Sequence, residues 1–274
     1  MPLKVFLRLK LSEPIRKEFL TPDGIHGLFF SLLGKELASE LHEAYGGAKP
    51  YSLHCGGLFT EGSTDELNLE VGLLDDRLTA PVLSDLYLKR GKNLFTFRGK
   101  KIRVEALVRV LPSWIKTYEE LVEDGRLYPK VGVRFLKPST FRRNSVDLPF
   151  PLPELVFKSL LKRWLAFSPV RPEVDLRNFY DRVEVERYSL RTRKVVLASG
   201  GKLTAFEGSV VYNLTKVGDE RALRWFSTLL RYALWAGVGR KTTMGLGKVK
   251  ITPLNGNAGG GPRRGPQDDS PPDV

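Results

Sequence analysis

Apolar and polar residues alternate at the start of the chain. Over residues 3–11 every second position is apolar: Leu3, Val5, Leu7, Leu9 and Leu11. A period of two places these side chains on one face of a β-strand. The spacing then becomes helical, with apolar residues at Ile25, Leu28, Phe29, Leu32, Leu33, Leu37 and Leu41. Because Thr21 and Pro22 are typical of an N-cap and a first helical position, the pattern predicts a strand followed by helical structure that ends at Gly46 and Gly47.

Gly34 lies inside this helical pattern. A glycine within a helix costs roughly 1 kcal/mol relative to alanine, so the segment is open to a break at this position. One continuous helix and two shorter helices are both compatible with the spacing.

The same two periods continue along the rest of the chain. In the first half they predict strands over residues 51–60, 66–73 and 101–111 and a short helix over 78–90. In the second half they predict strands over residues 131–137, 183–198, 203–214 and 247–253 and helices over 152–166 and 220–236. The order strand, helix, strand, strand, helix, strand therefore occurs twice, although the halves share no residue-level identity. We predict an α+β fold of two tandem ferredoxin-like, RRM-like domains with antiparallel sheets.

We expect the first domain to cover residues 1–125 and the second to cover residues 126–254. Hydrophobic residues make up 42% of the chain, which is enough for each domain to bury a core. The last segment, residues 255–274, consists mainly of Gly, Pro and Asp, with no large apolar side chain except the final valine. Such a composition cannot form a packed core, so we predict a disordered tail.

The chain carries 44 Lys and Arg residues against 31 Asp and Glu residues, a formal net charge of +13. This excess favours a polyanionic partner, either nucleic acid or an anionic membrane. No stretch approaches the roughly 20 apolar residues that span a bilayer, and charged residues interrupt the amino terminus where a signal peptide has an apolar run. We therefore expect a cytoplasmic protein that binds nucleic acid and no membrane. A single cysteine, Cys55, with scattered histidines gives no metal-ligand spacing, so we expect neither a metal nor another cofactor.

A glycine-rich basic segment covers residues 237–248 and joins the last predicted helix to the last strand. Its candidate ligand-binding residues are Gly237, Gly239, Arg240, Lys241, Thr242, Gly245 and Gly247. Glycines allow positive φ angles and a close approach of the backbone, so consecutive N–H groups can point at phosphate oxygens while the two cations neutralise them. The segment matches neither a P-loop nor the dinucleotide fingerprint. The alternative is a flexible connection with solvated charges.

This segment resembles the carboxyl-terminal glycine-rich loop of the RAMP superfamily of CRISPR systems. It is most similar to that of the sixth numbered Cas family, the endoribonucleases that trim precursor CRISPR RNA. Residues 135–143, Phe-Leu-Lys-Pro-Ser-Thr-Phe-Arg-Arg, and the helix that ends at Lys162, Arg163 and Trp164 resemble that family's central block. Residues 205–212 resemble the strand before its last helix. The resemblance is strongest from Phe135 onward.

The resemblance implies two ferredoxin-like domains and a CRISPR repeat precursor transcript as the RNA partner. Other CRISPR-associated proteins and a second copy of the chain are the remaining partners that we consider. It also implies metal-independent cleavage, in which the RNA's own 2′-hydroxyl attacks the phosphate. That reaction needs a base, an acid and positive charge on the transition state. Histidine suits both proton-transfer roles, because its ordinary pKa is near 6.5.

The chain has three histidines, and the resemblance selects among them. His42 lies near the end of the first helical segment, where the helix macrodipole favours a cation and where the resembled family has its usual catalytic histidine. His26 lies near the start of that segment, where the family often has a second active-site side chain. One continuous helix would hold the two about 24 Å apart, so His26 is a catalytic partner only if the segment breaks at Gly34 and folds back. We expect His54, within a strand, to be structural.

Basic residues that flank strand ends of the second half are candidates for the phosphate-binding face. They are Arg142, Arg143, Arg191, Arg193 and Lys194, together with Arg240 and Lys241. A non-catalytic RNA-binding subunit with the same fold predicts the same basic face and glycine-rich segment, and His42 distinguishes it from an enzyme. A ribosomal or RNA-chaperone protein would share the charge but would leave the paired glycines unexplained.

Overall fold

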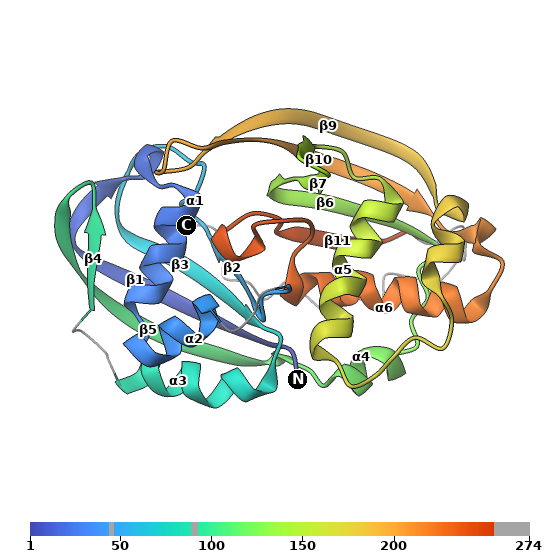
Figure 1. Ribbon diagram of the computed structural model, residues 1–274, viewed down its shortest axis with the longest axis horizontal. Coiled ribbons are helices and arrows are strands. Elements are labelled where there is room, and N and C mark those ends of the chain that lie inside the picture. The colour runs from blue at the N-terminus through green and yellow to red at the C-terminus, as the bar shows by residue number, and fades with distance from the viewer. Residues whose placement is uncertain (44–46, 89–92, 255–274) are drawn as a thin grey trace.

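The computed structural model describes residues 1–43, 47–88 and 93–254, and the predicted tail lies outside these residues. The first half forms a five-stranded antiparallel sheet in the order β2-β3-β1-β5-β4. Its strands are β1 (Leu3–Arg16), β2 (Tyr51–Cys55), β3 (Ser63–Leu73), β4 (Asn93–Phe97) and β5 (Lys100–Ile115). Its helices are α1 (Pro22–Ser31), α2 (Lys35–Glu43) and α3 (Thr79–Leu88), which lie in front of the sheet in Figure 1.

The second half forms a four-stranded antiparallel sheet in the order β11-β6-β10-β9. Its strands are β6 (Lys130–Ser139), β9 (Glu184–Val196), β10 (Lys202–Asn213) and β11 (Val249–Pro253). Two long helices, α5 (Pro153–Phe167) and α6 (Glu220–Ala236), pack against each other and against this half. A small hairpin, β7 (Phe141–Arg143) with β8 (Val146–Leu148), follows β6, and the short helix α4 (Tyr118–Glu123) precedes it.

Both halves therefore have the ferredoxin-like strand order, and the predicted fold class is confirmed. In each half the first strand lies at the centre beside the third, with the second and fourth strands outside. The structure adds β4 as a further edge strand and the β7-β8 hairpin, which the patterns did not predict. Since the first sheet ends at residue 115 and the second begins at residue 130, we propose residues 1–125 and 126–254 as the two domains.

The first helical segment is two helices. Thr21 caps α1 by accepting a hydrogen bond from the Gly24 N–H at 3.1 Å, and Pro22 occupies the first turn, as predicted. The chain leaves the helix after Ser31 and re-enters one at Lys35. Between them the Gly34 N–H donates to the Asp85 carboxylate at 2.6 Å. A side chain from α3 thus takes the donor that a continuous helix would have used internally.

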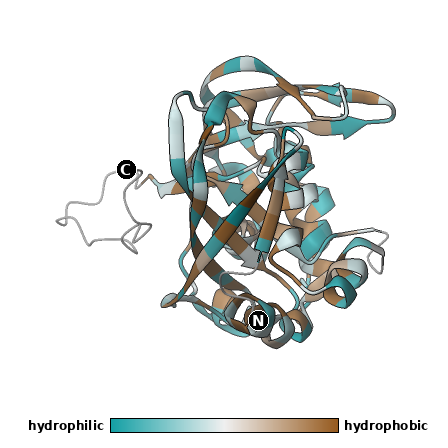
Figure 2. Ribbon diagram, turned by 90° about the vertical axis from the view of Figure 1, so that its left-hand side faces the viewer, coloured by the Kyte–Doolittle hydropathy of each residue, from teal (hydrophilic) through white to brown (hydrophobic). Residues whose placement is uncertain are grey.

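Each half has its own hydrophobic core. Apolar residues that alternate along the strands face the helices, and brown and teal segments accordingly alternate along the first sheet in Figure 2. The first core is built mainly from leucine, whereas the second contains the buried aromatic side chains Trp164, Tyr212, Phe226 and Tyr232. No helix in the described part of the chain combines the length and the apolar character that crossing a membrane requires.

The two halves meet where the carboxyl end of α6 packs against β2 and β3. The Ser52 hydroxyl donates to the Trp235 carbonyl oxygen at 2.5 Å, and the Trp235 indole N–H donates to the Trp114 carbonyl oxygen at 2.9 Å. A Cβ atom on Gly72 would overlap with the same Trp235 carbonyl. Glycine at position 72 is therefore what lets the helix end approach the first sheet.

Replacing Gly72 by alanine should lower the free energy of unfolding by about 1–3 kcal/mol, because the new methyl group overpacks the junction. Gly27→Ala is the matched control, since nothing lies within 4 Å of a Cβ at that exposed helical position. The control should raise stability by up to about 1 kcal/mol through helix propensity. Urea denaturation of both variants checks this, and a Gly72→Ala variant as stable as the wild type would contradict the close approach.

Candidate functional site

The break at Gly34 brings the two candidate histidines to the same phenyl ring. The Phe30 ring centre lies 4.4 Å from the His26 imidazole and 6.4 Å from the His42 imidazole. The separation of the imidazoles cannot exceed the sum of these distances, which is less than half of the roughly 24 Å expected for one continuous helix. The structure therefore satisfies the condition on which His26 was considered as a partner of His42.

His26 lies on α1 in a half-buried position. Its Nε2 atom lies 2.9 Å from the Tyr51 hydroxyl, and its ring contacts Phe30. Burial, together with smaller contributions from His42, Lys49 and Lys241, lowers the pKa of His26 to about 4. The imidazole is therefore neutral at pH 7 and serves as a hydrogen-bonding group.

His42 is exposed in the last turn of α2. The Lys49 ammonium group donates to the His42 carbonyl oxygen at 2.8 Å and lies 3.4 Å from the Leu41 carbonyl oxygen. Lysine thus supplies donors for carbonyls that a helix end leaves without partners. The arrangement fixes the helix end and leaves the His42 imidazole open to solvent and to a bound molecule.

The glycine-rich segment is folded by the protein itself. Positive φ angles occur at Gly237, Gly239, Gly245 and Gly247, between 68° and 90°, and at Lys241. Several of its backbone N–H groups donate to other parts of the protein: Val238 to Gly247, Gly239 to Ser159, Arg240 to Thr140 and Gly247 to Pro138. These groups are consequently not available for phosphate oxygens, contrary to the expected row of N–H donors.

Three of the four predicted glycines, Gly237, Gly245 and Gly247, are buried. A Cβ on Gly245 or Gly247 would collide with Leu58 or with the Val238 carbonyl oxygen, respectively. These glycines therefore set the shape of the loop, which presents the side chains of Arg240 and Lys241 at its tip. Thr242 begins a 3₁₀ turn, η5 (Thr242–Met244), and is itself buried.

Arg163 on α5 holds this loop in place and was not among the predicted site residues. Only 7% of it is exposed, and its guanidinium group donates to the carbonyl oxygens of Ala236 and Gly237 and, at 2.9 Å, to the Thr242 hydroxyl. Burial lowers the pKa of Arg163. The only sequence signal was its place in the block that resembles a known family.

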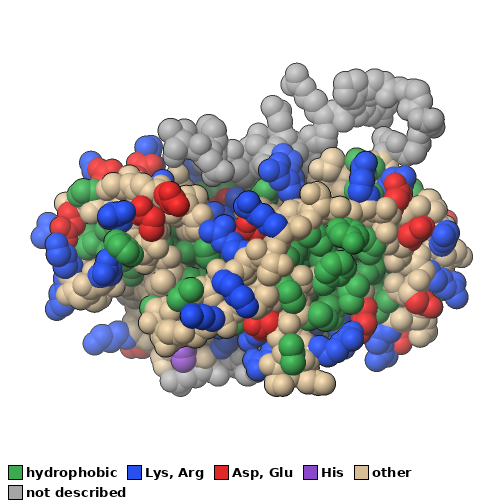
Figure 3. Space-filling model, turned by 90° about the horizontal axis from the view of Figure 1, so that it is seen from above, with side chains coloured by type: hydrophobic (Ala, Val, Ile, Leu, Met, Phe, Trp, Pro, Cys, Tyr) green, Lys and Arg blue, Asp and Glu red, His purple; other side chains and the backbone are tan. Residues whose placement is uncertain are grey.

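A basic hollow of about 380 Å³ lies beside the two histidines, between the loop and α5. Its basic lining residues are Lys49, Arg142, Lys158, Lys162, Arg163, Arg240 and Lys241. None of the described residues that line it is acidic. Lys49 and Lys241 are also the cations that act on His26, which places the hollow next to the histidine pair. Figure 3 shows Lys and Arg side chains gathered over the middle of the molecule.

The predicted phosphate contacts fall into two groups. Arg142 lines this hollow together with Arg240 and Lys241, and Arg240 forms an ion pair with Asp147 at 2.8 Å. Arg191 and Arg193 lie on β9, where both pair with Glu207 and line a second hollow.

Two further predicted cations also have partners in the structure. Lys194 Nζ donates to the Thr204 hydroxyl at 2.7 Å, and Arg143 lies 3.6 Å from the Glu154 carboxylate. The structure adds Lys158 and Lys162 on α5, which helical periodicity alone could not assign to a site, and Lys49, which lies between α2 and β2.

The β9-β10 connection crosses from the second half to the start of α1. The Asp23 carboxylate accepts hydrogen bonds from the Ala198 N–H at 2.9 Å and the Ser199 N–H at 3.3 Å. Leu246 of the glycine-rich loop packs with Val195 and Leu203 of the same two strands. The helix that carries His26 is thus tied to the strands that carry Arg191, Arg193 and Lys194.

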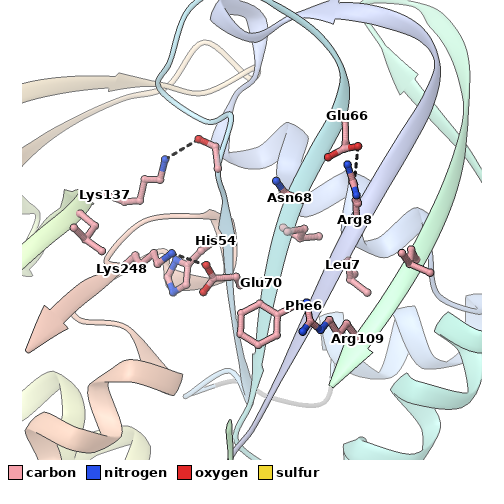
Figure 4. Close-up of a pocket in the computed structure, with 14 residues that line it drawn as sticks. Phe6, Leu7, Arg8, His54, Glu66, Asn68, Glu70, Arg109, Lys137 and Lys248 are labelled. Carbon is pink, nitrogen blue, oxygen red and sulfur yellow. Dashed lines mark hydrogen bonds and ion pairs between the residues drawn. The ribbon is translucent and has the colours of Figure 1, made fainter. Parts of the chain in front are cut away.

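Another hollow, of about 400 Å³, lies where strands of the first sheet meet β6 and Lys248 (Figure 4). Its acidic residue Glu70 is paired within the protein: the carboxylate lies 2.5 Å from Lys248 Nζ and 3.5 Å from Lys4 Nζ. His54 lines this hollow but is only 3% exposed, and burial lowers its pKa well below the usual value. Among the residues that the structure describes, His, Cys, Asp and Glu side chains form no group of three or more that could hold a metal ion.

The low pKa of His26 predicts a pH-dependent contribution to stability. The folded-state pKa of about 4 lies below the ordinary 6.5, so between these values only the unfolded state binds the proton, and the free energy of unfolding falls as the pH falls. Because His26 is only partly buried, we expect the free energy of unfolding to fall by less than the full pKa shift implies, on the order of 2 kcal/mol between pH 7 and pH 4.

His26→Gln removes this contribution, while His54 contributes equally to both proteins. The difference in unfolding free energy between wild type and His26→Gln should therefore shrink as the pH is lowered. Denaturation curves at several pH values measure it, and a difference independent of pH would contradict the burial of a neutral His26.

Comparison with known proteins agrees with this geometry. The family model for the CRISPR-associated endoribonuclease Cas6 matches residues 133–249. The Cas6 endoribonuclease of Mycobacterium tuberculosis is 21% identical over 261 residues, which cover 92% of this chain and 78% of that protein.

Solved structures show a closer likeness. A Cas6 product complex is 30% identical, with a TM-score of 0.73 over 92% of this chain and 100% of that chain. The Thermus thermophilus Cas6 is also 30% identical, with a TM-score of 0.70 over 92% of this chain and 98% of that chain. With two ferredoxin-like halves, a glycine-rich basic loop and this likeness along nearly its whole length, the chain belongs to the Cas6 family of CRISPR-associated endoribonucleases.

Proposed function

We propose that this protein binds CRISPR repeat RNA and cuts precursor crRNA within each repeat without a metal ion. The observation that carries the proposal is the convergence of His26 and His42 on Phe30, beside a hollow with a basic lining. The solved relatives include a Cas6 bound to its product, a Cas6 bound to a substrate mimic, and a Cas6 variant in which one histidine is replaced by alanine.

The proposed reaction is an attack of the RNA on itself. The 2′-hydroxyl oxygen forms a bond to the adjacent phosphorus and loses its proton to a base, while the bond from phosphorus to the 5′-oxygen breaks. The leaving 5′-oxygen takes a proton from an acid. The products are a 2′,3′-cyclic phosphate and a 5′-hydroxyl, and no water is consumed.

The environments of the two histidines suggest different roles. His42 is exposed at a helix end and is the residue to which we assign proton transfer. His26 is half-buried and neutral, and it would hold a hydrogen bond to the reacting phosphate. Lys49 and Lys241 lie close enough to His26 to affect its pKa, and they would stabilise the negative charge of the transition state.

The RNA would lie across the basic hollow and along the strands of the second half. We assign phosphate contacts to Arg142, Arg240 and Lys241 and add Lys158 and Lys162, which line the same hollow. A second group, Arg143, Arg191, Arg193 and Lys194, would contact RNA further along β7 and β9. The buried glycines and Thr242 would act by shaping the loop.

Attack by the 2′-hydroxyl predicts specific ends on the cleaved RNA and no need for a metal ion. Cleavage of a repeat RNA should continue in excess EDTA and should leave a 2′,3′-cyclic phosphate and a 5′-hydroxyl. A substrate with a deoxyribose just upstream of the scissile phosphate should bind and remain uncut, because it has no nucleophile. End-group analysis by mass spectrometry checks the products. A strict requirement for magnesium would contradict this mechanism.

Two variants should distinguish the residue that cleaves RNA from the residues that bind it. His42→Ala should bind RNA normally and cut roughly 10²- to 10⁴-fold more slowly, the usual loss for one proton-transfer residue. Arg240→Ala with Lys241→Ala should bind more weakly, and its affinity should depend less on salt, by about 0.7 per contact in log–log slope on single-stranded RNA. Cutting by the double variant should partly recover at high protein concentration.

Arg221→Ala with Arg224→Ala is the matched control for the double variant. It removes the same charge from exposed residues at the start of α6. The control should keep both the wild-type affinity and the wild-type salt dependence. Normal cutting by His42→Ala would refute the assignment of proton transfer to His42, and full affinity in the Arg240, Lys241 variant would refute the role of the loop.

A further inference from the structure

The Tyr51 hydroxyl lies between the glycine-rich loop and His26. Tyr51 on β2 is 1% exposed, and its hydroxyl lies 2.9 Å from His26 Nε2. The Thr243 side chain lies close enough to this hydroxyl to affect its pKa. Thr243 belongs to η5, which packs against both β2 and α1. One phenolic oxygen therefore connects the loop of the second half to the helix that carries His26.

The direction of the hydrogen bond between Tyr51 and His26 follows from the chemistry of the two groups. Burial raises the pKa of Tyr51 well above its ordinary value, so the hydroxyl keeps its proton. A phenolic O–H is a stronger acid than a neutral imidazole N–H, and a bare imidazole nitrogen accepts more strongly than a phenolic oxygen, so we assign the single proton of Tyr51 to the hydrogen bond with His26 Nε2. A ring nitrogen that accepts a hydrogen bond carries no proton, so the neutral imidazole holds its proton on Nδ1.

We propose that Tyr51 is a positioning residue that, with Thr243, holds His26 as the Nδ1–H tautomer. The proposal rests on the proposed function, in which His26 faces the reacting phosphate. It assigns the chemistry of His26 to one atom: Nδ1–H donates, and Nε2 is occupied by Tyr51. It also makes this tautomer depend on the loop whose Arg240 and Lys241 we assign to RNA.

The hydroxyl of Tyr51 can be tested apart from its ring. The ring packs against Phe29 and Phe30, with centres 5.6 and 6.2 Å away, and so belongs to the core. Tyr51→Phe keeps these contacts and removes only the hydrogen-bonding oxygen. Thr243→Val removes the loop hydroxyl that acts on Tyr51 and leaves the buried ring untouched, so it tests the same proposal if Tyr51→Phe proves unstable.

The first measurement determines the tautomer of His26 directly. In a protein labelled with ¹⁵N-histidine, protonated and bare ring nitrogens have well-separated chemical shifts, and three histidines are few enough to assign by substitution. We expect His26 to show a protonated Nδ1 and a bare Nε2 at neutral pH, and a mixture of tautomers in Tyr51→Phe and Thr243→Val. A wild-type His26 protonated on Nε2 would overturn the proposal.

The second measurement is single-turnover cleavage of a repeat RNA. Tyr51→Phe should cut at least about tenfold more slowly, with RNA affinity within about twofold of the wild type, because it loses part of what a reacting histidine contributes. Thr243→Val should change the rate in the same direction, and the double variant should be no slower than Tyr51→Phe. Tyr180→Phe is the control, since it removes a buried hydroxyl that has no partner among the described residues and lies outside the site.

The outcomes separate this proposal from the proposed function. An unchanged cleavage rate in Tyr51→Phe together with a changed tautomer would overturn the positioning role. A parallel loss of RNA affinity and thermal stability, with the tautomer unchanged, would also overturn it, because a purely structural role predicts that result. Failure of the proposed function would appear instead as a wild-type protein that cuts no RNA while His26 still shows the Nδ1–H tautomer.

Discussion

The carboxyl end of α6 is the point on which the rest of the site depends. The last carbonyl groups of a helix have no donors within the helix and must find them elsewhere. Here the Trp235 carbonyl is satisfied by Ser52 of the first half, and the carbonyls of Ala236 and Gly237 are satisfied by Arg163 of the second half. The same groups therefore complete the helix and fix how the two halves meet. The glycine-rich loop starts at this point and packs beside β2. Ser52, which bonds the helix end, is the neighbour of Tyr51 in the sequence.

A buried arginine is an expensive way to satisfy carbonyl groups, because a charge loses its hydration on burial. The cost is reduced here because the acceptors lie at the negative end of a helix macrodipole, and because the donors find three acceptors in fixed positions. Both α5 and the loop are held by this one side chain. The base of the loop is thus fixed by hydrogen bonds, and its half-buried cations Arg240 and Lys241 are carried near the histidines.

Hydrophobic patterns within short segments predicted most of the helices and strands. The two hydrophobic periods located every element of the two ferredoxin-like plans, and Gly34 indicated the break between α1 and α2. They did not predict β4 or the β7-β8 hairpin, whose strands are only three to five residues long. Tyr51 and Arg163 were missed because their importance depends on contacts between segments far apart in the chain. The loop glycines were recognised as important. Their role in the structure differs from the predicted one, because they allow close packing and do not expose a row of N–H groups.

Burial and nearby positive charges both lower the pKa of His26, and a bound RNA would change mainly the effect of the charges. Burial is the larger cause of its low pKa, and the cations His42, Lys49 and Lys241 add to it. Phosphates in the hollow would neutralise the contribution of the cations and leave that of burial in place. The pKa of His26 would then rise somewhat when the substrate arrives, but burial would still hold it below the ordinary value. The basic lining that attracts RNA is therefore a secondary cause of the neutral imidazole, and burial, with the hydrogen bond from Tyr51, is the main one.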